Sequence, residues 1–226
     1  MQTVAPVLSV AGLAKAVPGG RQLFRGLAID VAPGEIVAIM GESGVGKSTL
    51  LNLVAGLDTA DAGRIAIAGH DLAGLDDDAR TVLRRDRVGF VFQAFHILPH
   101  LTLAQNIALP LVLARVAAET ALPRATAMLA KVGLGGRGDD YPAQLSGGEM
   151  QRIAIARALV HAPALILADE PTGNLDPETA ERVLALFVAE TRASGAGTVI
   201  VTHSDRAAQV ADRVLVLGAN GLVPRP

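Results

Sequence analysis

Residues 41–49 read GESGVGKST, the spacing of a phosphate-binding loop in which a lysine and two hydroxyls follow the glycines. Glycines let backbone N–H groups approach phosphate oxygens, because no Cβ stands in the way. Lys47 is expected to reach the β- and γ-phosphates, and the Ser48 hydroxyl is expected to bind Mg²⁺. The expected nucleotide contacts are Gly41, Glu42, Ser43, Gly44, Val45, Gly46, Lys47, Ser48 and Thr49.

The segments on either side of this loop support the same interpretation. Residues 36–40 (IVAIM) are apolar and β-branched, as in a buried strand, and residues 50–55 have a helical pattern that ends at Gly56. A strand, a glycine turn and a helix in this order are the context in which the motif binds phosphate. The positive end of the helix dipole would point at the same anion. The sequence therefore predicts a site for a nucleoside triphosphate with Mg²⁺.

Two acids follow a second apolar strand pattern, LILA at residues 165–168. Asp169 would stand at the carboxyl end of that strand, where it suits a ligand to Mg²⁺. Glu170 would point to the other side and could polarise an attacking water. Two acids after a strand can also cap a helix, and the phosphate-binding loop is what favours the catalytic interpretation here.

A second glycine turn lies at Ser146, Gly147, Gly148 and Glu149, within the run LSGGEMQ. Ser146 is a good helix N-cap, and the glycines would leave bare N–H groups at the helix start, so the turn could bind an anion. It could also be a helix start without any ligand. One chain can hardly fold both glycine turns around one nucleotide. The pattern therefore suggests two chains, each of which supplies this turn to the other's nucleotide.

Gln93 and His203 each follow an expected strand, at residues 88–92 and 198–202. Ligands of open α/β sheets bind at the carboxyl ends of strands, which favours a functional role for His203. Taken alone, either residue could equally be an exposed surface side chain. The remaining histidines show no metal-ligand spacing and are interpreted as structural or surface residues: His70, His96, His100 and His161.

Composition excludes several classes of protein. The 226 residues are 50% hydrophobic, but no run reaches the roughly 18 uncharged apolar residues of a membrane span, and no export signal is recognised. The absence of cysteine excludes disulfides and thiolate metal sites. A net charge of −2, one Tyr and no Trp argue against nucleic acid as a partner. These features favour a soluble cytoplasmic protein.

Apolar strands that alternate with helices predict an α/β fold with a mostly parallel sheet covered on both faces. Two antiparallel strands, at 7–10 and 27–31 around the Gly19-Gly20 turn, open the chain. One nucleotide-binding domain is expected over 1–226, with an α/β core at about 1–85 and 160–226 and a helical subdomain at about 86–159. Expected helices cover residues 76–87, 103–109 before a kink at Pro110, 124–132, 148–160 and 178–193.

The loop GESGVGKST, Gln93, LSGGEMQ, LILADE, Asn174-Leu175-Asp176 and His203 occur in the order found in ABC-transporter ATPase subunits, and almost the whole chain resembles that family. The resemblance implies a P-loop NTPase fold with a RecA-like core, an antiparallel β section and a helical subdomain. It also implies an ATP-hydrolysing enzyme that binds ATP and Mg²⁺ and pairs with a second copy of itself around two ATP molecules.

Roles for the matching residues follow from the same resemblance. Glu170 would be the general base, and His203 would be the γ-phosphate switch. Gln93 would sense the γ-phosphate and Mg²⁺, whose metal ligands would be Ser48, Gln93 and Asp169. The turn from Ser146 to Glu149 would contact the γ-phosphate of the partner's ATP, and Asp176 would touch the other chain.

One departure from the family concerns the adenine. The family usually stacks the base on an aromatic ring after the first strand, where this chain has Val17. An aliphatic contact lacks the stacking contribution of about 0.5–1.5 kcal/mol. Weaker discrimination between ATP and GTP is therefore expected, unless Phe24 takes over the stacking.

Within the family the chain is most similar to the LolD and MacB group, and in that group to the YbbA branch, on the runs AGLD, GFVFQ, PAQL and DEPTGNLD. The resemblance implies an integral membrane permease of the FtsX/MacB type as partner, and a peripheral location on the inner face of the cell membrane. The permease-facing groove is expected at Phe95, Ile97, Leu98 and Leu101, which could instead belong to the subdomain core.

Two other functions remain possible from the sequence. A nucleotide-gated scaffold would bind ATP and a membrane complex but hydrolyse weakly, and the set Lys47, Asp169, Glu170 and His203 argues against it. A DNA-repair ATPase of the same superfamily would separate its two glycine turns by long coiled coils, whereas the intervening residues here lack heptads.

Overall fold

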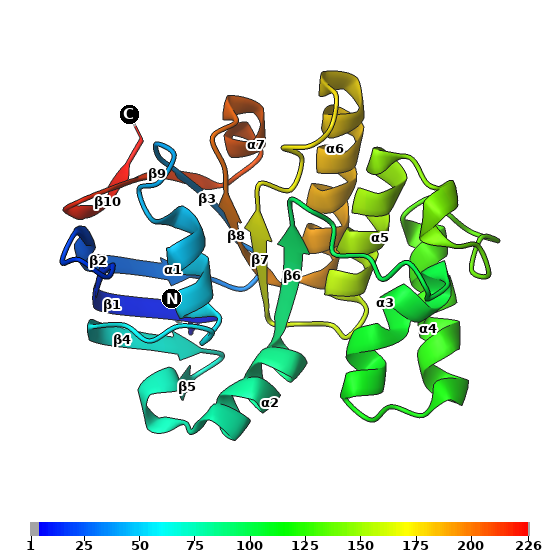
Figure 1. The fold of residues 1–226 in the computed structure, drawn as a ribbon, viewed down its shortest axis with the longest axis horizontal. Helices are drawn as coiled ribbons and strands as arrows, with labels where there is room; N and C mark the ends of the chain where they lie inside the picture. Colours follow the sequence, from blue (N-terminus) through cyan, green and yellow to red (C-terminus); the bar gives the residue numbers. More distant parts are fainter. Residues whose placement is uncertain (1–4, 226) are drawn as a thin grey trace.

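The computed structural model describes residues 5–225, which build two sheets and two layers of helices (Figure 1). The strands are β1 (Leu8–Ala16), β2 (Gln22–Val31), β3 (Ile36–Met40), β4 (Ala62–Ile67), β5 (His70–Asp71), β6 (Val88–Phe92), β7 (Leu165–Asp169), β8 (Gly197–Val201), β9 (Arg213–Gly218) and β10 (Gly221–Pro224). The α-helices are α1 (Lys47–Val54), α2 (Asp77–Arg87), α3 (Leu103–Leu113), α4 (Ala118–Lys131), α5 (Gly147–Leu159), α6 (Pro177–Ser194) and α7 (Asp205–Gln209).

The larger sheet is six-stranded, in the order β10-β9-β3-β8-β7-β6. All neighbours in it are parallel except β10, which runs antiparallel to β9. The carboxyl ends of β3, β6, β7 and β8 therefore meet at one edge of the sheet, where the chemistry-bearing residues follow each strand. This arrangement confirms the α/β fold with a mostly parallel sheet.

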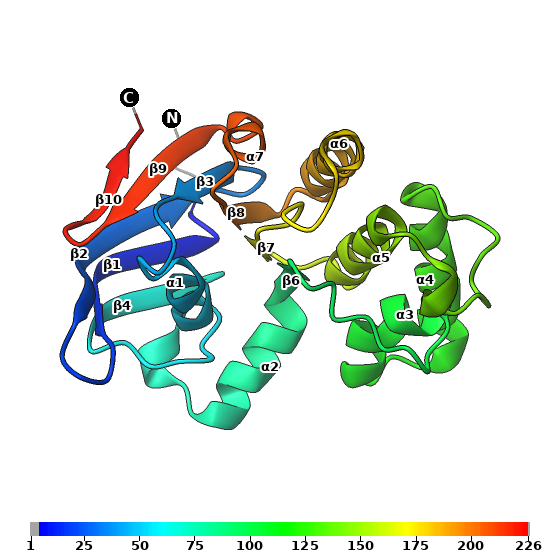
Figure 2. The ribbon, with the colours of Figure 1, turned by 45° about the horizontal axis from the view of Figure 1, so that its top comes forward.

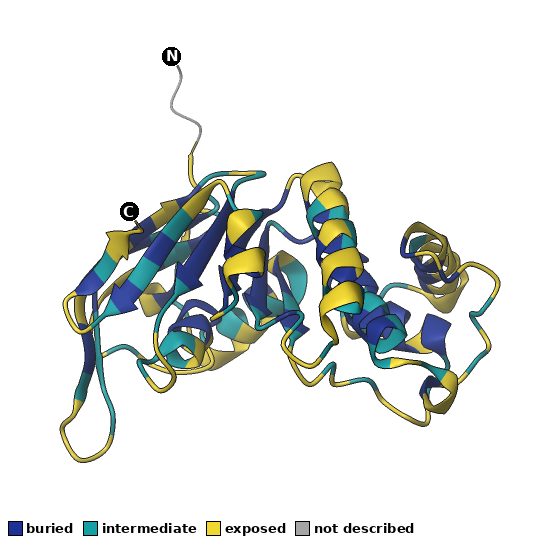
Figure 3. Cartoon of the chain, turned by 90° about the horizontal axis from the view of Figure 1, so that it is seen from above, coloured by how far each residue is buried: buried dark blue, intermediate teal, exposed yellow. Residues whose placement is uncertain are grey.

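Helices and a second sheet cover both faces of the six-stranded sheet, as expected for buried parallel strands. Val37 and Ile39 of β3 pack on the α1 side, in a cluster shared with the four-stranded sheet, while Ile36 packs toward α5 and α6. Buried residues concentrate in the strands and on the inner faces of the helices, whereas exposed residues lie on the outer faces (Figure 3).

The smaller sheet has the order β2-β1-β4-β5, with antiparallel neighbours throughout. This confirms the antiparallel section expected at the start of the chain, although β1 and β2 are longer than the pattern suggested. The turn between them is closed by a hydrogen bond from Val17 N–H to the Arg21 carbonyl (3.0 Å). α1 lies between this sheet and the strands β7 and β8 (Figure 2).

Helices α3, α4 and α5 gather at the opposite end of the molecule around a core of their own (Figure 2). The helical segment was expected to begin near residue 86, but β6 still belongs to the six-stranded sheet and α3 begins only at Leu103. The strand pattern of β6 was recognised, whereas its place beside β7 depends on pairing with a distant strand.

Two helices are longer than the sequence predicted. Each contains a proline, and the sequence pattern placed a helix boundary at or next to that proline. α3 passes through Pro110 as one helix to Leu113, and α4 begins at Ala118 and includes Pro123. Each proline lacks the N–H that would bond the carbonyl four residues earlier, a cost that burial of Leu111 and Ala121 in the helical core offsets. The expected starts and caps at Asp76 and Thr102 are confirmed.

Candidate functional site

A cavity of about 460 Å³ lies at the carboxyl edge of the six-stranded sheet and brings together residues from five parts of the chain. It is lined by Ser43, Gly44, Gly46, Lys47, Ser48 and Thr49 of the loop, by Val17, Arg21 and Leu23, and by Gln93, Asp169, Glu170 and His203. The parallel pairing of β3, β8, β7 and β6 explains the convergence, since each strand delivers its following residues to one edge.

The loop between β3 and α1 has the backbone of an anion cradle. Gly44 (φ 79°) and Gly46 (φ 107°) adopt left-handed conformations that other residues rarely take. Gly46 is the N-cap of α1 and provides no side-chain hydrogen bond to the helix start. The first N–H groups of α1 therefore have no side-chain cap and face the cavity, as in helix termini that bind phosphate.

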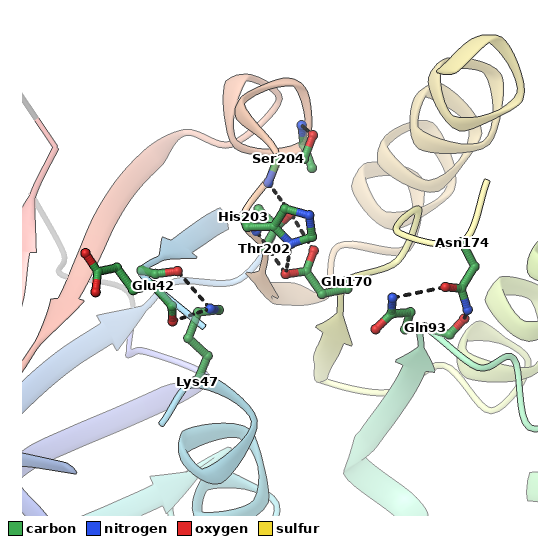
Figure 4. A network of polar contacts seen from close by, with 10 residues as sticks. Glu42, Lys47, Gln93, Glu170, Asn174, Thr202, His203 and Ser204 are labelled. Atoms are coloured by element: carbon green, nitrogen blue, oxygen red, sulfur yellow. Dashed lines mark hydrogen bonds and ion pairs between the residues drawn. The ribbon is translucent and has the colours of Figure 1, made fainter. Parts of the chain in front are cut away.

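Lys47 is turned toward its own loop, where Nζ donates to the carbonyls of Gly41 (2.8 Å) and Glu42 (2.9 Å) (Figure 4). Such a lysine can exchange carbonyl oxygens for phosphate oxygens without a change in the backbone. The geometry thus gives one cation beside a set of bare N–H groups, which suits a polyphosphate.

Val17, Arg21 and Leu23, from the hairpin of β1 and β2, also line the cavity and give it two apolar side chains. Phe24 does not line it: its side chain is fully buried, and a Cβ on Gly46 would stand 3.4 Å from the ring. Phe24 therefore cannot stack on a base. The expectation of weak discrimination between ATP and GTP, which depended on Phe24 not stacking, stays a prediction. Arg21 is exposed and was not considered as a site residue from the sequence.

Ser48 and Asp169 line the same cavity, at the start of α1 and at the end of β7. Within residues 5–225, no group of three or more His, Cys, Asp or Glu side chains is arranged so that it could hold a metal ion. Mg²⁺ commonly takes one or two protein oxygens and completes its octahedron with phosphate oxygens and water. The hydroxyl and the carboxylate fit such a site, which makes Ser48 and Asp169 suitable ligands.

Gln93 is tied to a loop that lies 81 residues away in the sequence. Its Nε2 donates to Asn174 Oδ1 (3.1 Å), and Asn174 Nδ2 donates back to the Gln93 carbonyl (2.9 Å) (Figure 4). Gly173 lies close by, so a Cβ there would stand 2.9 Å from Gln93 Nε2 and would displace the Gln93 amide. Movement of Gln93 is thereby coupled to the loop that leads to Asp176.

Glu170 and His203 contact each other at the centre of the site (Figure 4). Glu170 Oε1 accepts from the His203 backbone N–H (2.9 Å) and lies 2.7 Å from His203 Nδ1, while Oε2 accepts from Thr202 Oγ1 (2.9 Å). Glu170 has a left-handed backbone (φ 47°), a strained conformation for a residue other than glycine that is common at functional sites. That backbone turns the side chain toward the end of β8.

The turn at Ser146 lies outside this cavity. Ser146, Gly148 and Glu149 line a different cavity of about 490 Å³, between α4, α5 and α6. Ser146 caps α5 as expected: its Oγ accepts from Glu149 N–H (3.4 Å), and Glu149 Oε2 accepts from Ser146 N–H (2.8 Å). One chain thus keeps its two glycine turns apart, which agrees with the idea that the second turn serves another chain.

Charges at two helix starts are set by local hydrogen bonds. The backbone N–H and hydroxyl of Ser146, with Arg137 beside them, hold the pKa of Glu149 below its ordinary value. The N–H and hydroxyl of Thr179 likewise lower the pKa of Asp176, which is the N-cap of α6. Asp176 therefore has a structural role in its own chain besides the expected contact with a second one.

An apolar groove lies apart from the surface that the sequence predicts to face the permease. A groove of about 540 Å³ lies between α2, β6 and α3, with Phe90, Phe92, Leu109, Pro110 and Leu113 as its apolar lining. None of Phe95, Ile97, Leu98 and Leu101 lines this groove, and Ile97 packs against the helical core. The expected permease contact at Phe95, Ile97, Leu98 and Leu101 stays a prediction, and the groove is formed instead by residues of β6 that precede Gln93 and by residues of α3.

Arg157 holds the loop at the mouth of this groove. Its two terminal nitrogens donate to the carbonyls of Phe95 (2.7 Å) and His96 (2.6 Å), both of which have left-handed backbones. Burial lowers the pKa of Arg157, since desolvation disfavours the charged form.

Within residues 5–225, no helix is long and apolar enough to cross a membrane.

Comparison with known proteins gives a family match over most of the chain. Residues 24–173 match the model of the ABC transporter family. The chain is 46% identical over 221 residues to the lipoprotein-releasing system ATP-binding protein LolD of Cereibacter sphaeroides, covering 96% of this chain and 99% of that protein. It is 43% identical over 224 residues to the macrolide export ATP-binding/permease protein MacB of Shigella flexneri, covering 98% of this chain and 34% of MacB.

Solved structures agree with these relatives. The dimeric structure of MJ0796, a bacterial ABC transporter cassette, superposes with a TM-score of 0.83 at 36% identity, covering 95% of this chain and 96% of that one. A post-hydrolysis state of the same cassette, bound to ADP and Pi, has a TM-score of 0.82 at 35% identity over the same shares. The similarity to the LolD and MacB group is thereby confirmed, and the YbbA branch stays a prediction.

Proposed function

This chain belongs to the ABC transporter family, as an ATPase that binds ATP with Mg²⁺, and we propose that it drives an FtsX/MacB-type permease by ATP-dependent pairing of two copies. The observation that carries the proposal is the single cavity that joins the phosphate-binding loop with Gln93, Asp169, Glu170 and His203. A binding module would need the loop alone. An ATPase also needs the acids and a γ-phosphate contact at the same edge.

In the proposed reaction Lys47 and the N–H groups of α1 hold the β- and γ-phosphates, and Ser48 and Asp169 hold Mg²⁺. Glu170 accepts a proton from the attacking water, which approaches the γ-phosphate in line. His203 leaves Glu170 and donates to the γ-phosphate. This step fits the 71% exposure of the His203 side chain, because little packing resists its rotation.

The second copy supplies the turn at Ser146, Gly147 and Gly148. Support comes from the placement of that turn in a separate cavity, away from the phosphate-binding loop of its own chain. The MJ0796 cassette, which has the same fold, is described as dimeric. Loss of the γ-phosphate would remove the bridge between the two chains, so the pair opens after hydrolysis.

The permease contact is proposed at the groove between α2, β6 and α3. Its floor carries apolar side chains with arginines such as Arg84 and Arg85 among them, and Leu113 is 60% exposed on α3. A short amphipathic helix of the partner would bury this surface. Gln93 follows β6 directly and bonds Asn174, so closure of the nucleotide site would shift the groove and the loop before α6 together. The chain would then lie on the inner face of the cell membrane.

The proposed division of the chain follows from the same scheme. A core that binds the nucleotide and a helical part that carries the second glycine turn must move relative to each other. We therefore keep one nucleotide-binding domain with an inserted helical subdomain, whose first described helix is α3. The narrower assignment to the YbbA branch remains part of this proposal.

The purine base is proposed to rest in the cavity against Val17 and Leu23, with the Arg21 guanidinium over its exposed face. Arg21 is absent from the ion pairs and side-chain hydrogen bonds found within residues 5–225, so its plane is available for stacking. Guanidinium groups stack on any purine, whereas Val17 offers only apolar contact. ATP and GTP should therefore have similar Michaelis constants.

Replacement of Arg21 tests this base site. Arg21→Ala should raise the Michaelis constants of ATP and GTP by a similar factor of about 3 to 10, the loss of one stacking contact, with kcat unchanged. Arg64→Ala removes an exposed arginine on β4 and is the matched control. An Arg21→Ala enzyme with unchanged Michaelis constants would exclude the guanidinium from base recognition.

The Glu170→Gln variant tests the function as a whole. It should bind ATP like the unaltered protein, lose turnover by a factor of at least about 10², and accumulate as a dimer in size-exclusion chromatography with ATP. Purified with ATP from detergent-solubilised membranes, it should retain a multi-span permease with a large periplasmic domain. Full activity would exclude Glu170 as the base. Recovery of soluble protein alone would favour the weakly hydrolysing nucleotide-gated scaffold.

A further inference from the structure

Thr202 stands at the end of β8, directly before His203, and is 1% exposed. Its Oγ1 accepts a hydrogen bond from Ser204 N–H (3.0 Å) and donates to Glu170 Oε2 (2.9 Å) (Figure 4). A hydroxyl has one hydrogen, and with the Ser204 N–H on its lone pair that hydrogen is aimed at the carboxylate. Thr202 therefore has a fixed donor direction.

The Glu170 carboxylate accepts from three donors, all of which come from residues 202 and 203. Thr202 Oγ1 binds Oε2, and the backbone N–H and Nδ1 of His203 bind Oε1. A carboxylate has about four acceptor positions. About one position is thus left for a water molecule while His203 keeps its ring against Glu170.

The three donors differ in how firmly they are held. The Thr202 side chain is buried and the His203 N–H is part of the backbone that follows β8, whereas the His203 ring is 71% exposed. When the ring turns toward a nucleotide, only its own bond to Oε1 is lost. The other two donors remain, one on each oxygen, and they fix the rotation of the carboxylate plane.

We propose that Thr202 is the positioning residue for Glu170: its hydroxyl holds Oε2, so that the acceptor position released on Oε1 by the His203 ring faces the attacking water. The proposal rests on the proposed function of Glu170 as the base. Thr202 itself touches neither nucleotide nor water in this scheme and acts through Glu170 alone.

Replacement of Thr202 by Val and by Ser separates this role from packing. Valine keeps the shape of the side chain and removes the hydroxyl, whereas serine keeps the hydroxyl. Thr202→Val should lower kcat by about 10- to 100-fold, because small misplacements of a reacting group are costly. Its Michaelis constant for ATP should change by less than about two-fold. Thr202→Ser should stay within about three-fold of the unaltered enzyme.

Unaltered ATP binding and an unchanged ATP-trapped dimer show that Thr202→Val is folded. Equal kcat for Thr202→Val and the unaltered protein would overturn the proposal. So would a Thr202→Ser enzyme as slow as Thr202→Val, since then the methyl group and not the hydroxyl matters.

A double-variant cycle with Glu170→Gln tests whether Thr202 acts through Glu170. Single-turnover hydrolysis of labelled ATP should be the same for Glu170→Gln and for Glu170→Gln/Thr202→Val. A further drop by the full factor in the double variant would mean an independent role and overturn the proposal. If Glu170→Gln alone is fully active, the proposed function of Glu170 fails as well. If it is inactive while Thr202→Val is fully active, only the Thr202 proposal fails.

Discussion

The starts of α1 and α5 both carry glycines and look alike in the sequence, yet the structure finishes them in different ways. α1 has Gly46 as its N-cap and no side-chain hydrogen bond to its first turn. α5 has a complete capping box, in which Ser146 and Glu149 each bond the other's backbone N–H, and Arg137 pairs with Glu149. One helix start is open and the other is closed by its own residues.

The difference teaches what each turn must do before a nucleotide arrives. The open start of α1 gains its missing partners from a phosphate, so the bound triphosphate contributes to its stability. The turn before α5 lies on the surface of the single chain, with Ser146 exposed, and in the proposed pair it must persist there until a second chain brings the nucleotide. Its cap keeps it in shape during that time. Three changes in these two turns test the comparison.

The largest effect is expected from the cation at the open start. Lys47→Ala removes the positive charge beside the N–H groups of α1, so those groups alone would have to stabilise the phosphate. Turnover should fall by about 10² to 10³. ATP binding should weaken in the same variant, as measured by equilibrium titration. Arg64→Ala, which removes a cation from an exposed ion pair on β4, should change neither quantity. A normal rate in Lys47→Ala would mean that the helix start alone suffices.

A smaller effect is expected from a methyl group at the closed start. A Cβ on Gly148 would lie 2.4 Å from Thr179 Cγ2, so Gly148→Ala must displace either the Thr179 side chain or the start of α5. ATP binding by one chain should be unchanged, while steady-state turnover should fall by about 10-fold, because a displacement near 1 Å is costly. Thr179→Ser removes the clashing methyl, and the double variant should recover most of the activity. Failure of this rescue would show that Gly148 matters for another reason.

The smallest effect is expected from the cap itself. Glu149→Ala should lower the free energy of unfolding by roughly 0.5–1.5 kcal/mol, the range for a helix cap. Because folding lowers the pKa of Glu149, its stabilisation is present above the ordinary value of 4.5 and is lost as the pH falls through the folded value. Urea unfolding at pH 7 should therefore separate the variant from the unaltered protein, and the two should converge toward pH 3.

Glu178→Ala is the control for the cap, since Glu178 forms an exposed ion pair in the first turn of α6. It should change the unfolding midpoint little at either pH. A Glu149→Ala protein whose midpoint matches that of Glu178→Ala at pH 7 would show that the closed start of α5 does not depend on its capping box.

Features that depend on a few neighbouring residues were predicted well. The N-caps at Asp76, Thr102 and Ser146 were expected and are present, because each cap joins residues three positions apart. Strands β6, β7 and β8 were found within one or two residues of their bounds. The bounds of α3 and α4 were predicted too short at their prolines. Burial of these helices outweighs the hydrogen bond that each proline loses.

Features that join distant residues were not accessible from the pattern. The groove between α2, β6 and α3 was not anticipated, because residues of separate elements form it. From the sequence, Phe24 was a candidate to stack on the base, but its side chain is fully buried in the core. Thr202 was missed although it adjoins His203, and its place directly before a site histidine at the end of a strand was the available signal.

The sequence by itself determined a site for a nucleoside triphosphate with Mg²⁺, because a glycine loop, its lysine and its hydroxyl are a local arrangement that nine consecutive residues can specify. The order of that loop, LSGGEMQ and LILADE along the chain then identified an ABC ATPase. The tertiary structure decided how the remaining side chains meet. The bonds of Gln93 to Asn174 and of Glu170 to Thr202 cross 81 and 32 residues of the sequence. Such contacts exist only once parallel strands bring their carboxyl ends to one edge, and hydrophobic packing of the sheet, spread over the whole chain, sets that geometry.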